Sequence, residues 1–538
     1  MAQTEMRMTA AIRPNLGMDF PDPDVIFVDG TYYMISTTMH FLPGGQILRS
    51  GDLLHWEHVA YVFDTLDGTD AQKLRNGKYI YGKGMWAASL RYHKGTFYVA
   101  FVCNDTQKTY LFRSEKIEGP WRKSEIEGFY HDCSLLFDDD DRIYVVYGNR
   151  SIYLTELNAE LTGPKEGGLS RLLLKDSDET RLGFEGSHFY KINGRYYLFL
   201  IHSRKDRWRR VEACFSSDSL EGEFEGGDIF DDDMGFRDSG IAQGGIVQGV
   251  GGNWYAVMFQ DSGAVGRLPV VVPVTFENHR PVFGIDGKAP KTLSLPISEK
   301  FPEGYEYAPL SSSDDFRYGF PWGTKKEDTS DPETFQRKYG TFGLASVWQC
   351  NHEPDLNLLY RDEKTGTLWI ATDILSLNIN HCKNTMTQRM RYPGSAAEVT
   401  LDYSHLKDGD KMGLCAFQGD YAWVGVERRA DRFFEVMVSH KSTEGIWDLS
   451  PVPGDIIEER ELSPSSEKAL RVRMEVDFSS EKDQALCLTK KGDSWESIGK
   501  PHKLCFRLDH FTGVRFGLFV YSTKETGGKG GFSRFEFE

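Results

Sequence analysis

The sequence lacks three features that would each indicate a particular class of protein. It has no apolar run long enough to span a bilayer, no apolar core near its beginning of the kind that a secretory signal needs, and no Cys-x-x-Cys or zinc-ligand spacing. We therefore expect no membrane association, and we interpret the eight scattered cysteines as free, mostly buried thiols. This predicts a cytoplasmic protein; the alternative is a secreted protein whose leader has been removed.

Basic charge is also scarce. The chain has 63 Lys and Arg against 80 Asp and Glu, which gives a formal net charge of −17. Such a surface repels a phosphate backbone, so nucleic acid is excluded as a partner, whereas a neutral sugar is compatible with it. The 538 residues are too many for one core and predict two or three domains. The 54 glycines and 13% aromatic residues suit a strand-rich protein.

A short hairpin signal recurs five times in the first half of the chain. Each copy is a polar or glycine turn followed by aromatic and β-branched residues, a pattern typical of a tight turn that enters a strand. The copies are VDGTYYM (28–34), HKGTFYV (93–99), DDRIYVV (140–146), INGRYYL (192–198) and VGGNWYA (250–256). Repeating units of about 40–50 residues that each form a small antiparallel sheet indicate propeller blades. We predict an all-β chain in which residues 1–308 form a five-bladed β-propeller.

The repeat also predicts a pocket. Counting back 12 residues from the aligned tyrosines reaches Trp86, Asp132, Glu185 and Gln243, and counting back 11 in the first repeat reaches Asp22. The innermost strands of a propeller surround one axis, so equivalent positions on them converge at one end of it. Three carboxylates from distant parts of the sequence are therefore expected to meet.

Clustered carboxylates favour acid–base chemistry. Like charges raise the pKa of one member, so one carboxyl stays ionised while another stays protonated near neutral pH. Hydrolysis of a glycosidic bond needs such a base and such an acid. Pro21 and Pro23 fix the backbone around Asp22. Asp24 is the rival candidate for the base, and we interpret it as a solvated or structural acid.

Several segments resemble glycoside hydrolase family 43. FPDPDVIFVDGTYYM, MWAASLRYHKGTFYV, HDCSLLFDDDDRIYVVYG and FEGSHFYKINGRYYLF are similar to its four signature segments. AQGGIVQGVGGNWYAVMFQDSGAVGRLPVVVPV (242–274) resembles the fifth-blade segment of its β-xylosidase and α-L-arabinofuranosidase branch. The resemblance implies that Asp22 is the general base, Glu185 is the general acid and Asp132 orients that acid and raises its pKa. It also implies that Arg267 lies against the base or the sugar. It further implies inversion of the anomeric centre, with the Asp22 and Glu185 carboxyls about 6.5–9.5 Å apart.

Four further residues are candidates for substrate binding. Trp86 is expected to stack on the sugar ring, with core packing between blades as the alternative. His40 and Phe41 are expected to form part of the pocket wall, although a structural role suits His40 equally. Gln243 occupies a position where many members of the family have a histidine. An amide can ligate calcium, but a structural Ca²⁺ ion is not indicated here, no metal site is predicted and no cofactor is required.

One further histidine, His188, is interpreted as structural. His188 is expected on the strand face opposite Glu185. The acidic runs 138–141 and 231–233 look like metal sites at first sight, but the first lies in a predicted hairpin turn and is interpreted as a solvated loop.

Residues 309–538 are predicted to form a β-sandwich. The Ser-, Asp- and Pro-rich stretch 308–333 suits a boundary, and short alternating runs separated by turn signals follow it. VWQCNHEPD (347–355), NTMTQRM (384–390) and GLCAFQGDYAWVGV (413–426) resemble the concanavalin-like jelly roll that accompanies many family 43 β-xylosidases. There this domain lends a loop to the pocket rim in some enzymes; the sequence does not identify such a loop here.

Together these observations predict an exo-acting, inverting glycosidase. It would release terminal β-D-xylose, α-L-arabinofuranose or both from xylo- or arabinoxylo-oligosaccharides derived from hemicellulose. Two alternatives remain open: a non-catalytic carbohydrate-binding protein on the same scaffold, and a propeller that binds other proteins.

Overall fold

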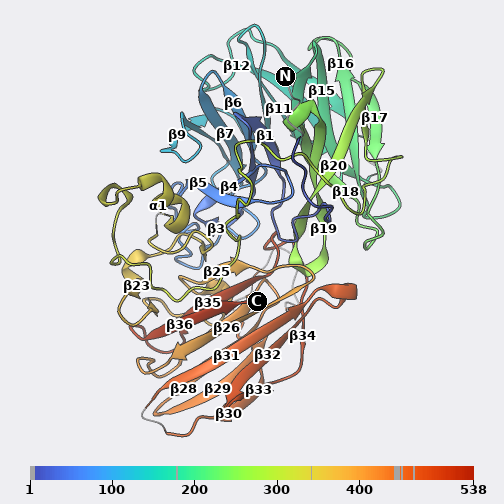
Figure 1. The fold of residues 1–538 in the computed structure, drawn as a ribbon. Coiled ribbons are helices and arrows are strands. Elements are labelled where there is room, and N and C mark those ends of the chain that lie inside the picture. Colours follow the sequence, from blue (N-terminus) through green and yellow to red (C-terminus); the bar gives the residue numbers. More distant parts are fainter. Residues whose placement is uncertain (1–5, 177–179, 341, 442–448, 450–451, 465–466) are drawn as a thin grey trace.

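Five four-stranded antiparallel sheets make up the N-terminal part of the molecule in the computed structural model (Figure 1). The structure describes residues 6–176, 180–340, 342–441, 449, 452–464 and 467–538. In chain order the sheets are β1 (Asp24–Val28), β2 (Thr31–Ser36), β4 (Gly44–Ser50) and β5 (Glu57–Phe63); β6 (Ser89–His93), β7 (Thr96–Cys103), β8 (Lys108–Ser114) and β9 (Arg122–Ile126); β10 (Ser134–Phe137), β11 (Ile143–Asn149), β12 (Ser151–Leu157) and β13 (Ser170–Lys175); β14 (Glu185–Ile192), β15 (Arg195–Ser203), β16 (Arg210–Ser217) and β17 (Glu225–Phe230); and β18 (Ile241–Gln248), β19 (Trp254–Asp261), β20 (Arg267–Glu277) and β21 (Arg280–Phe283).

The sheets are the blades of a closed propeller. The first strands of the blades, β1, β6, β10, β14 and β18, contact one another in ring order, and β18 contacts β1. A separate apolar core fills each of the five spaces between neighbouring blades. The segment before β1 completes the ring, because the Leu16 and Phe20 amides donate hydrogen bonds to the carbonyls of Pro269 and Arg267 in blade five. The predicted five-bladed propeller is confirmed.

Two facing sheets form the C-terminal domain. One sheet has the order β3–β22–β25–β35–β27–β28–β29–β30 and the other β23–β24–β36–β26–β31–β32–β33, with β34 beside β32. Their strands are β3 (Phe41–Leu42), β22 (Gln349–Asn351), β23 (Leu359–Asp362), β24 (Thr367–Ala371), β25 (Met386–Arg389), β26 (Gly394–Asp402), β27 (Asp410–Phe417), β28 (Ala422–Arg429), β29 (Arg432–Ser439), β30 (Asp455–Glu461), β31 (Ala469–Asp477), β32 (Gln484–Lys491), β33 (Ser494–Ser497), β34 (His502–Lys503), β35 (Arg515–Ser522) and β36 (Lys529–Phe537). Alternating apolar side chains of both sheets, such as Leu414 and Val472, fill one core. The predicted all-β sandwich is confirmed.

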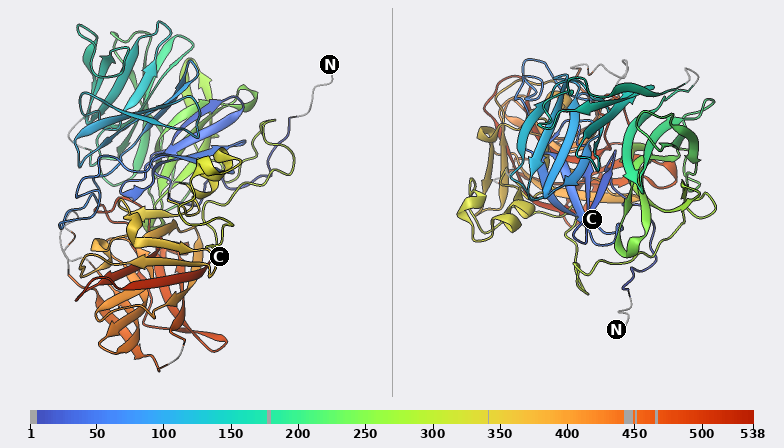
Figure 2. Two further views of the ribbon diagram at one scale, coloured as in Figure 1. Left: turned by 90° about the vertical axis from the view of Figure 1, so that its left-hand side faces the viewer. Right: turned by 90° about the horizontal axis from the view of Figure 1, so that it is seen from above.

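The propeller and the sandwich are stacked on each other (Figures 1 and 2). The short strand β3 comes from blade one, yet it pairs with β22 and so forms the edge of a sandwich sheet. The helix α1 (Pro332–Tyr339) lies beside the junction and contacts β5. The propeller sheets end at Phe283 and β22 begins at Gln349, so the boundary at 308/309 stays a prediction.

Helical structure is short throughout the described residues. Besides α1 there are 3₁₀ turns, which are η1 (Val250–Gly252), η2 (Gly263–Val265), η3 (Lys326–Asp328), η4 (Leu356–Leu358), η5 (Ile379–His381) and η6 (Ser479–Glu481). None of the helices in the described ranges is long and apolar enough to cross a membrane. All eight cysteines are unpaired, and seven of them are buried.

Candidate active site

The candidate site lies where the innermost strands of the blades begin. Asp22 and Asp132 each lie two residues before a first strand, and Glu185 is the first residue of β14. At this end the backbone is left-handed at one equivalent position in four blades, namely Asp22 (φ 52°), Asp132 (φ 48°), Gly186 (φ 64°) and Gln243 (φ 57°). The conformation costs roughly 1 kcal/mol or more for a residue other than glycine, and such residues concentrate at functional sites.

The strand register refines the equivalence expected from the sequence. In each of these blades the repeat tyrosine pairs with a residue on the first strand, and the left-handed residue lies four positions before that partner. In blade three, for example, Tyr144 pairs with Leu136, and the left-handed residue is Asp132. In blade four that position is Gly186, so Glu185 lies one residue earlier, beside a register shift in β14. A Cβ atom on Gly186 would lie 2.6 Å from Cγ of Gln243, so any other residue there would have to displace the Gln243 side chain.

Asp22 is held as an ion pair in a buried position. One carboxylate oxygen accepts a hydrogen bond from Nη1 of Arg267 at 2.8 Å, and the other accepts one from the Thr37 hydroxyl at 2.7 Å. Arg267 is itself buried, and its amide donates to the Asp19 carboxylate at 2.7 Å. Blade five therefore positions the arginine, and the arginine positions Asp22.

Glu185 and Asp132 meet around His131, a residue that the sequence analysis did not single out. Nε2 of His131 lies 3.7 Å from Oδ2 of Asp132 and 3.9 Å from Oε2 of Glu185. The Gly186 amide donates a hydrogen bond to Asp132 at 3.1 Å, and the Asn149 side-chain amide donates one to Glu185. Asp132 is buried, whereas the Glu185 side chain keeps 16% of its surface exposed and so faces an opening.

Electrostatics show that the three carboxylates share one region. Burial raises the pKa of Asp132 to about 7, and the charges of Glu185 and Asp22 add to this increase while His131 opposes it. Burial lowers the pKa of His131, but Asp132, Glu185 and Asp22 outweigh burial and raise it to about 9. The cluster therefore retains protons near neutral pH that free carboxyl groups would have lost.

The sandwich closes one side of the site with a loop that the sequence did not identify. This rim loop (residues 504–514) lies between β34 and β35. The Phe511 ring lies 4.2 Å from the Arg267 guanidinium and stacks on Trp86 with centroids 5.4 Å apart. The Gly513 amide donates to Asp19, the same carboxylate that accepts from the Arg267 amide. Asp19 therefore joins the rim loop to blade five.

Trp86 stands between the carboxylates and a cavity. Its ring centroid lies 5.3 Å from that of His131. On blade two it also lines a cavity of about 760 Å³ together with Ala71, Lys78, Tyr79, Gly82, Lys83, Asn104, Asp105 and Gln107. None of the three carboxylates lines this cavity. Stacking of Trp86 on a sugar stays a prediction.

The remaining predicted binding residues lie at different places. The backbone N–H of Gln243 donates to the buried Glu212 carboxylate at 2.8 Å, and the Gln243 side chain lies against Gly186, next to Glu185. His40 and Phe41 are fully buried at the junction of the two domains. The His40 ring is surrounded by Phe41, Tyr81, His352 and His510, and the Arg515 guanidinium covers Phe41 at 3.6 Å. Whether these two residues form part of the pocket wall stays a prediction.

The rival acid Asp24 has structural partners. It is buried and accepts hydrogen bonds from Arg91 at 2.6 Å and from the Leu90 amide at 2.7 Å, while His188 lies 3.7 Å from its other oxygen. Asp24 therefore joins blade one to blade two.

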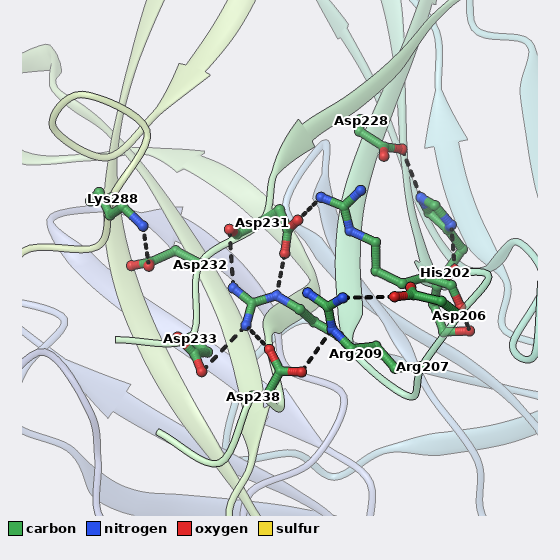
Figure 3. Close-up of polar contacts among 12 residues, drawn as sticks. His202, Asp206, Arg207, Arg209, Asp228, Asp231, Asp232, Asp233, Asp238 and Lys288 are labelled. Carbon is green, nitrogen blue, oxygen red and sulfur yellow. Dashed lines mark hydrogen bonds and ion pairs between the residues drawn. The ribbon is translucent and has the colours of Figure 1, made fainter. Parts of the chain in front are cut away.

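The acidic runs are paired with cations. Asp138 is buried and accepts hydrogen bonds from Lys191 and Tyr196, so the prediction of a solvated loop is wrong for this residue. Figure 3 shows Asp231 and Asp233 directed at Arg209 and Asp232 directed at Lys288.

One group of side chains has metal-ligand spacing within the described ranges. His131, Asp132 and Glu185 each offer a ligand atom, and these atoms lie within 4.8 Å of one another. Calcium prefers a set of oxygen ligands, so a group that includes a histidine does not fit Ca²⁺. The expectation that no metal or cofactor is required stays a prediction.

The comparisons with known proteins agree with this geometry. The family model described as Glycosyl hydrolases family 43 matches residues 12–281, and the model described as Beta xylosidase C-terminal Concanavalin A-like domain matches residues 338–538. A β-xylosidase of Formosa agariphila is 25% identical over 573 residues, which cover 96% of this chain and 88% of the relative. A non-reducing end α-L-arabinofuranosidase of Bacteroides ovatus is 26% identical over 460 residues, covering 81% and 80%.

A solved structure shares both domains. The bifunctional GH43-CE protein of Bacteroides eggerthii superposes with a TM-score of 0.85 at 35% identity and covers 98% of this chain. The present chain spans 64% of the length of that protein's chain.

Proposed function

Because the chain belongs to family 43 of the glycoside hydrolases, with the concanavalin-like domain that accompanies β-xylosidases, we propose that it removes single terminal sugars from hemicellulose oligosaccharides with inversion. The sugars are β-D-xylose, α-L-arabinofuranose or both. The observation that carries the proposal is the meeting of the Asp22–Arg267 pair with the His131–Asp132–Glu185 cluster at one end of the propeller.

In this proposal each carboxyl group has one task. Asp22, held by Arg267 and Thr37, takes a proton from a water molecule, whose oxygen attacks the anomeric carbon. Glu185 donates a proton to the glycosidic oxygen as the bond from that oxygen to the anomeric carbon breaks. Asp132 and His131 keep a proton available beside Glu185, which suits a general acid that works near neutral pH. The attacked carbon ends with inverted configuration.

The closed side of the site supports the release of terminal sugars. Phe511 and Trp86 stack on each other next to Arg267, so the rim loop of the sandwich lies against one side of the proposed site. In this proposal the loop blocks an internal segment of a polysaccharide from passing. A chain end fits such a pocket. Both proposed sugars are pentoses, and the named relatives include a β-xylosidase and an α-L-arabinofuranosidase.

The proposal is tested with the leaving-group dependence of a Glu185→Ala variant. Wild-type enzyme should release nitrophenol from nitrophenyl β-D-xyloside or α-L-arabinofuranoside, and NMR should show the inverted anomer first. Glu185→Ala should lose about 10²–10⁴-fold in kcat/KM on xylobiose but far less on an activated leaving group, which needs no proton.

Two results would count against the proposal. Equal losses on poor and good leaving groups would remove Glu185 from the role of acid. Binding of xylo-oligosaccharides without hydrolysis of any substrate would favour the non-catalytic sugar-binding alternative.

A further inference from the structure

An exposed tryptophan lies in blade four, in a loop at the end of the blade that carries Glu185. Trp208 keeps 45% of its surface exposed and belongs to the loop 204–209 between β15 and β16. Glu185 pairs with Ile201 at the end of β15, so this loop leaves blade four at the same end as Glu185. Single exposed aromatic side chains are common on soluble proteins, so the position of Trp208 at the Glu185 end of blade four is the feature that points to a ligand.

We propose that Trp208 is the stacking platform for the departing sugar, the unit on the leaving-group side of the scissile bond. The inference rests on the proposed function, because it takes Glu185 as the acid. The acid touches the glycosidic oxygen, so the leaving sugar must lie on the Glu185 side of the pocket. An indole ring offers the apolar face on which a pyranose ring stacks, with no charge required.

Ion pairs hold the platform loop in place (Figure 3). Arg209 lies 2.5 Å from carboxylate oxygens of both Asp231 and Asp238 and 3.3 Å from Asp233. Arg207 pairs with Asp238 at 2.7 Å, and Arg204 pairs with Asp231. The loop before β18 therefore braces the residues on both sides of Trp208. A braced aromatic ring binds at a lower entropy cost than a mobile one.

The ring is also connected to the catalytic groups. The Arg210 guanidinium lies 5.5 Å from the Trp208 ring and pairs with Asp261. Asp261 in turn lies 3.9 Å from Nε of Arg267, the partner of Asp22.

On the other side, the loop is anchored to the segment that leads to Glu185. Arg181 donates to the carbonyl of Asp206, and the His202 ring packs edge-on against Phe184 with centroids 5.2 Å apart. Trp208 is thus fixed relative to both the base and the acid.

Steady-state kinetics of the full-length enzyme with two leaving groups test this proposal. Trp208→Ala should lower kcat/KM for xylobiose and xylotriose about three- to tenfold. It should leave kcat/KM for β-D-xylosyl fluoride within about twofold, because fluoride has no ring to stack. If the wild-type enzyme prefers arabinofuranose, an arabinofuranosyl-xylobiose replaces the xylo-oligosaccharides and α-L-arabinofuranosyl fluoride replaces the xylosyl fluoride. Trp208→Phe should restore most of the loss, because it retains an aromatic face.

Tyr92→Ala is the matched control. Tyr92 keeps 41% of its surface exposed near the end of β6 that is remote from the site. Its removal should leave kcat/KM unchanged for both the fluoride and the oligosaccharides. Equal effects of Trp208→Ala on fluoride and oligosaccharide, or no effect on either, would overturn the proposal. The proposal would also be overturned if Trp208→Ala changed the oligomeric state but not the ratio of kcat/KM for the oligosaccharides to kcat/KM for the fluoride. The ring would then be a contact between copies of the chain. A wild-type enzyme inactive on every substrate would instead contradict the proposed function.

Discussion

Arg267 is the residue on which the geometry of the base depends. Its guanidinium binds Asp22 at 2.8 Å, and its face is covered by the rings of Phe511 at 4.2 Å and Phe259 at 5.0 Å. These rings hold the guanidinium by cation–π attraction to its face. They leave its N–H groups free to donate hydrogen bonds in the guanidinium plane. The arginine is therefore fixed from three directions before substrate arrives.

Replacement of Asp22 by Asn tests the base directly. The variant keeps the shape of the side chain and an oxygen for Thr37, but an amide cannot take a proton from water. We expect kcat to fall about 10²–10⁴-fold on every substrate, whatever the leaving group. Kinetics with nitrophenyl glycosides and with xylobiose measure this. Asp139→Asn, at a residue whose side chain is 83% exposed, is the control and should behave as wild type. Activity within tenfold of wild type would remove Asp22 from the role of base.

His131 makes stability depend on pH. Its pKa in the folded protein is raised to about 9 from the ordinary 6.5, so the native state holds a proton that the unfolded state has released between these values. The resulting stabilisation is fully present below pH 6.5 and is lost as the pH rises to 9, on the order of 2–3 kcal/mol. Urea unfolding at pH 6.5 and pH 9 should show a steeper decline for wild type than for His131→Gln. Parallel declines, or an NMR titration of His131 near 6.5, would contradict this.

Sequence reasoning found Asp22, Asp132 and Glu185 because the repeat places them at a countable distance from a tyrosine. It missed His131, although this residue directly precedes Asp132, because adjacent residues on a strand normally face opposite sides. The left-handed backbone at Asp132 removes that alternation and turns both side chains towards Glu185. A local backbone reversal of this kind leaves no periodic signal in the sequence.

At the level of elements, the blades were predictable and the rim loop was not. Each blade is a set of hairpins between residues close in sequence, so turn residues and alternation specify it locally. The rim loop has no periodicity, and its position follows from contacts with Asp19 and Arg267, which are distant in sequence. Likewise, the acidic run 231–233 gives no sign by itself that Arg209 neutralises two of its members.

Removal of the Phe511 ring should weaken the site more than the fold. Phe511→Ala takes away the surface that covers Arg267 and stacks on Trp86, which admits water beside the base. We expect kcat/KM to fall about tenfold or more, while the thermal midpoint changes by only a few degrees. Steady-state kinetics and thermal denaturation measure the two effects. Phe511→Tyr keeps the ring and should retain most of the activity. A loss of kcat/KM that tracked a large loss of stability would assign the ring to the fold alone.

At the scale of the whole molecule, the two domains share buried polar groups. Arg389 of the sandwich is buried, donates to the Asp19 carbonyl at 2.7 Å and to the Gln46 side chain at 2.6 Å, and lies 4.1 Å from the Phe20 ring. These two acceptors belong to the propeller, whereas a third, the Gln349 side chain at 3.1 Å, belongs to the sandwich. Separation of the domains would leave these groups without partners, which is costly for each buried donor or acceptor.

We therefore expect one cooperative unfolding transition for the full chain. Calorimetry should give a single peak whose calorimetric and van't Hoff enthalpies agree. Arg389→Ala should lower the whole transition, by about 3 kcal/mol or more, because it strands propeller acceptors as well as sandwich contacts. Two separate peaks, or a variant in which only one of two transitions moves, would show that the domains unfold independently.

The strand β3 has a practical consequence for protein engineering. Phe41 and Leu42 belong to the propeller part of the sequence but form the edge strand of a sandwich sheet. A cut between the two domains in the sequence therefore does not separate the two domains in space. A chimaera that grafts another family member's C-terminal domain onto this propeller would meet a mismatched border strand, and the reverse graft would leave Gln349–Asn351 as an open edge prone to aggregation. Residues 38–43 should be exchanged together with the grafted domain, whereas Thr37 should stay with the propeller because its hydroxyl binds Asp22.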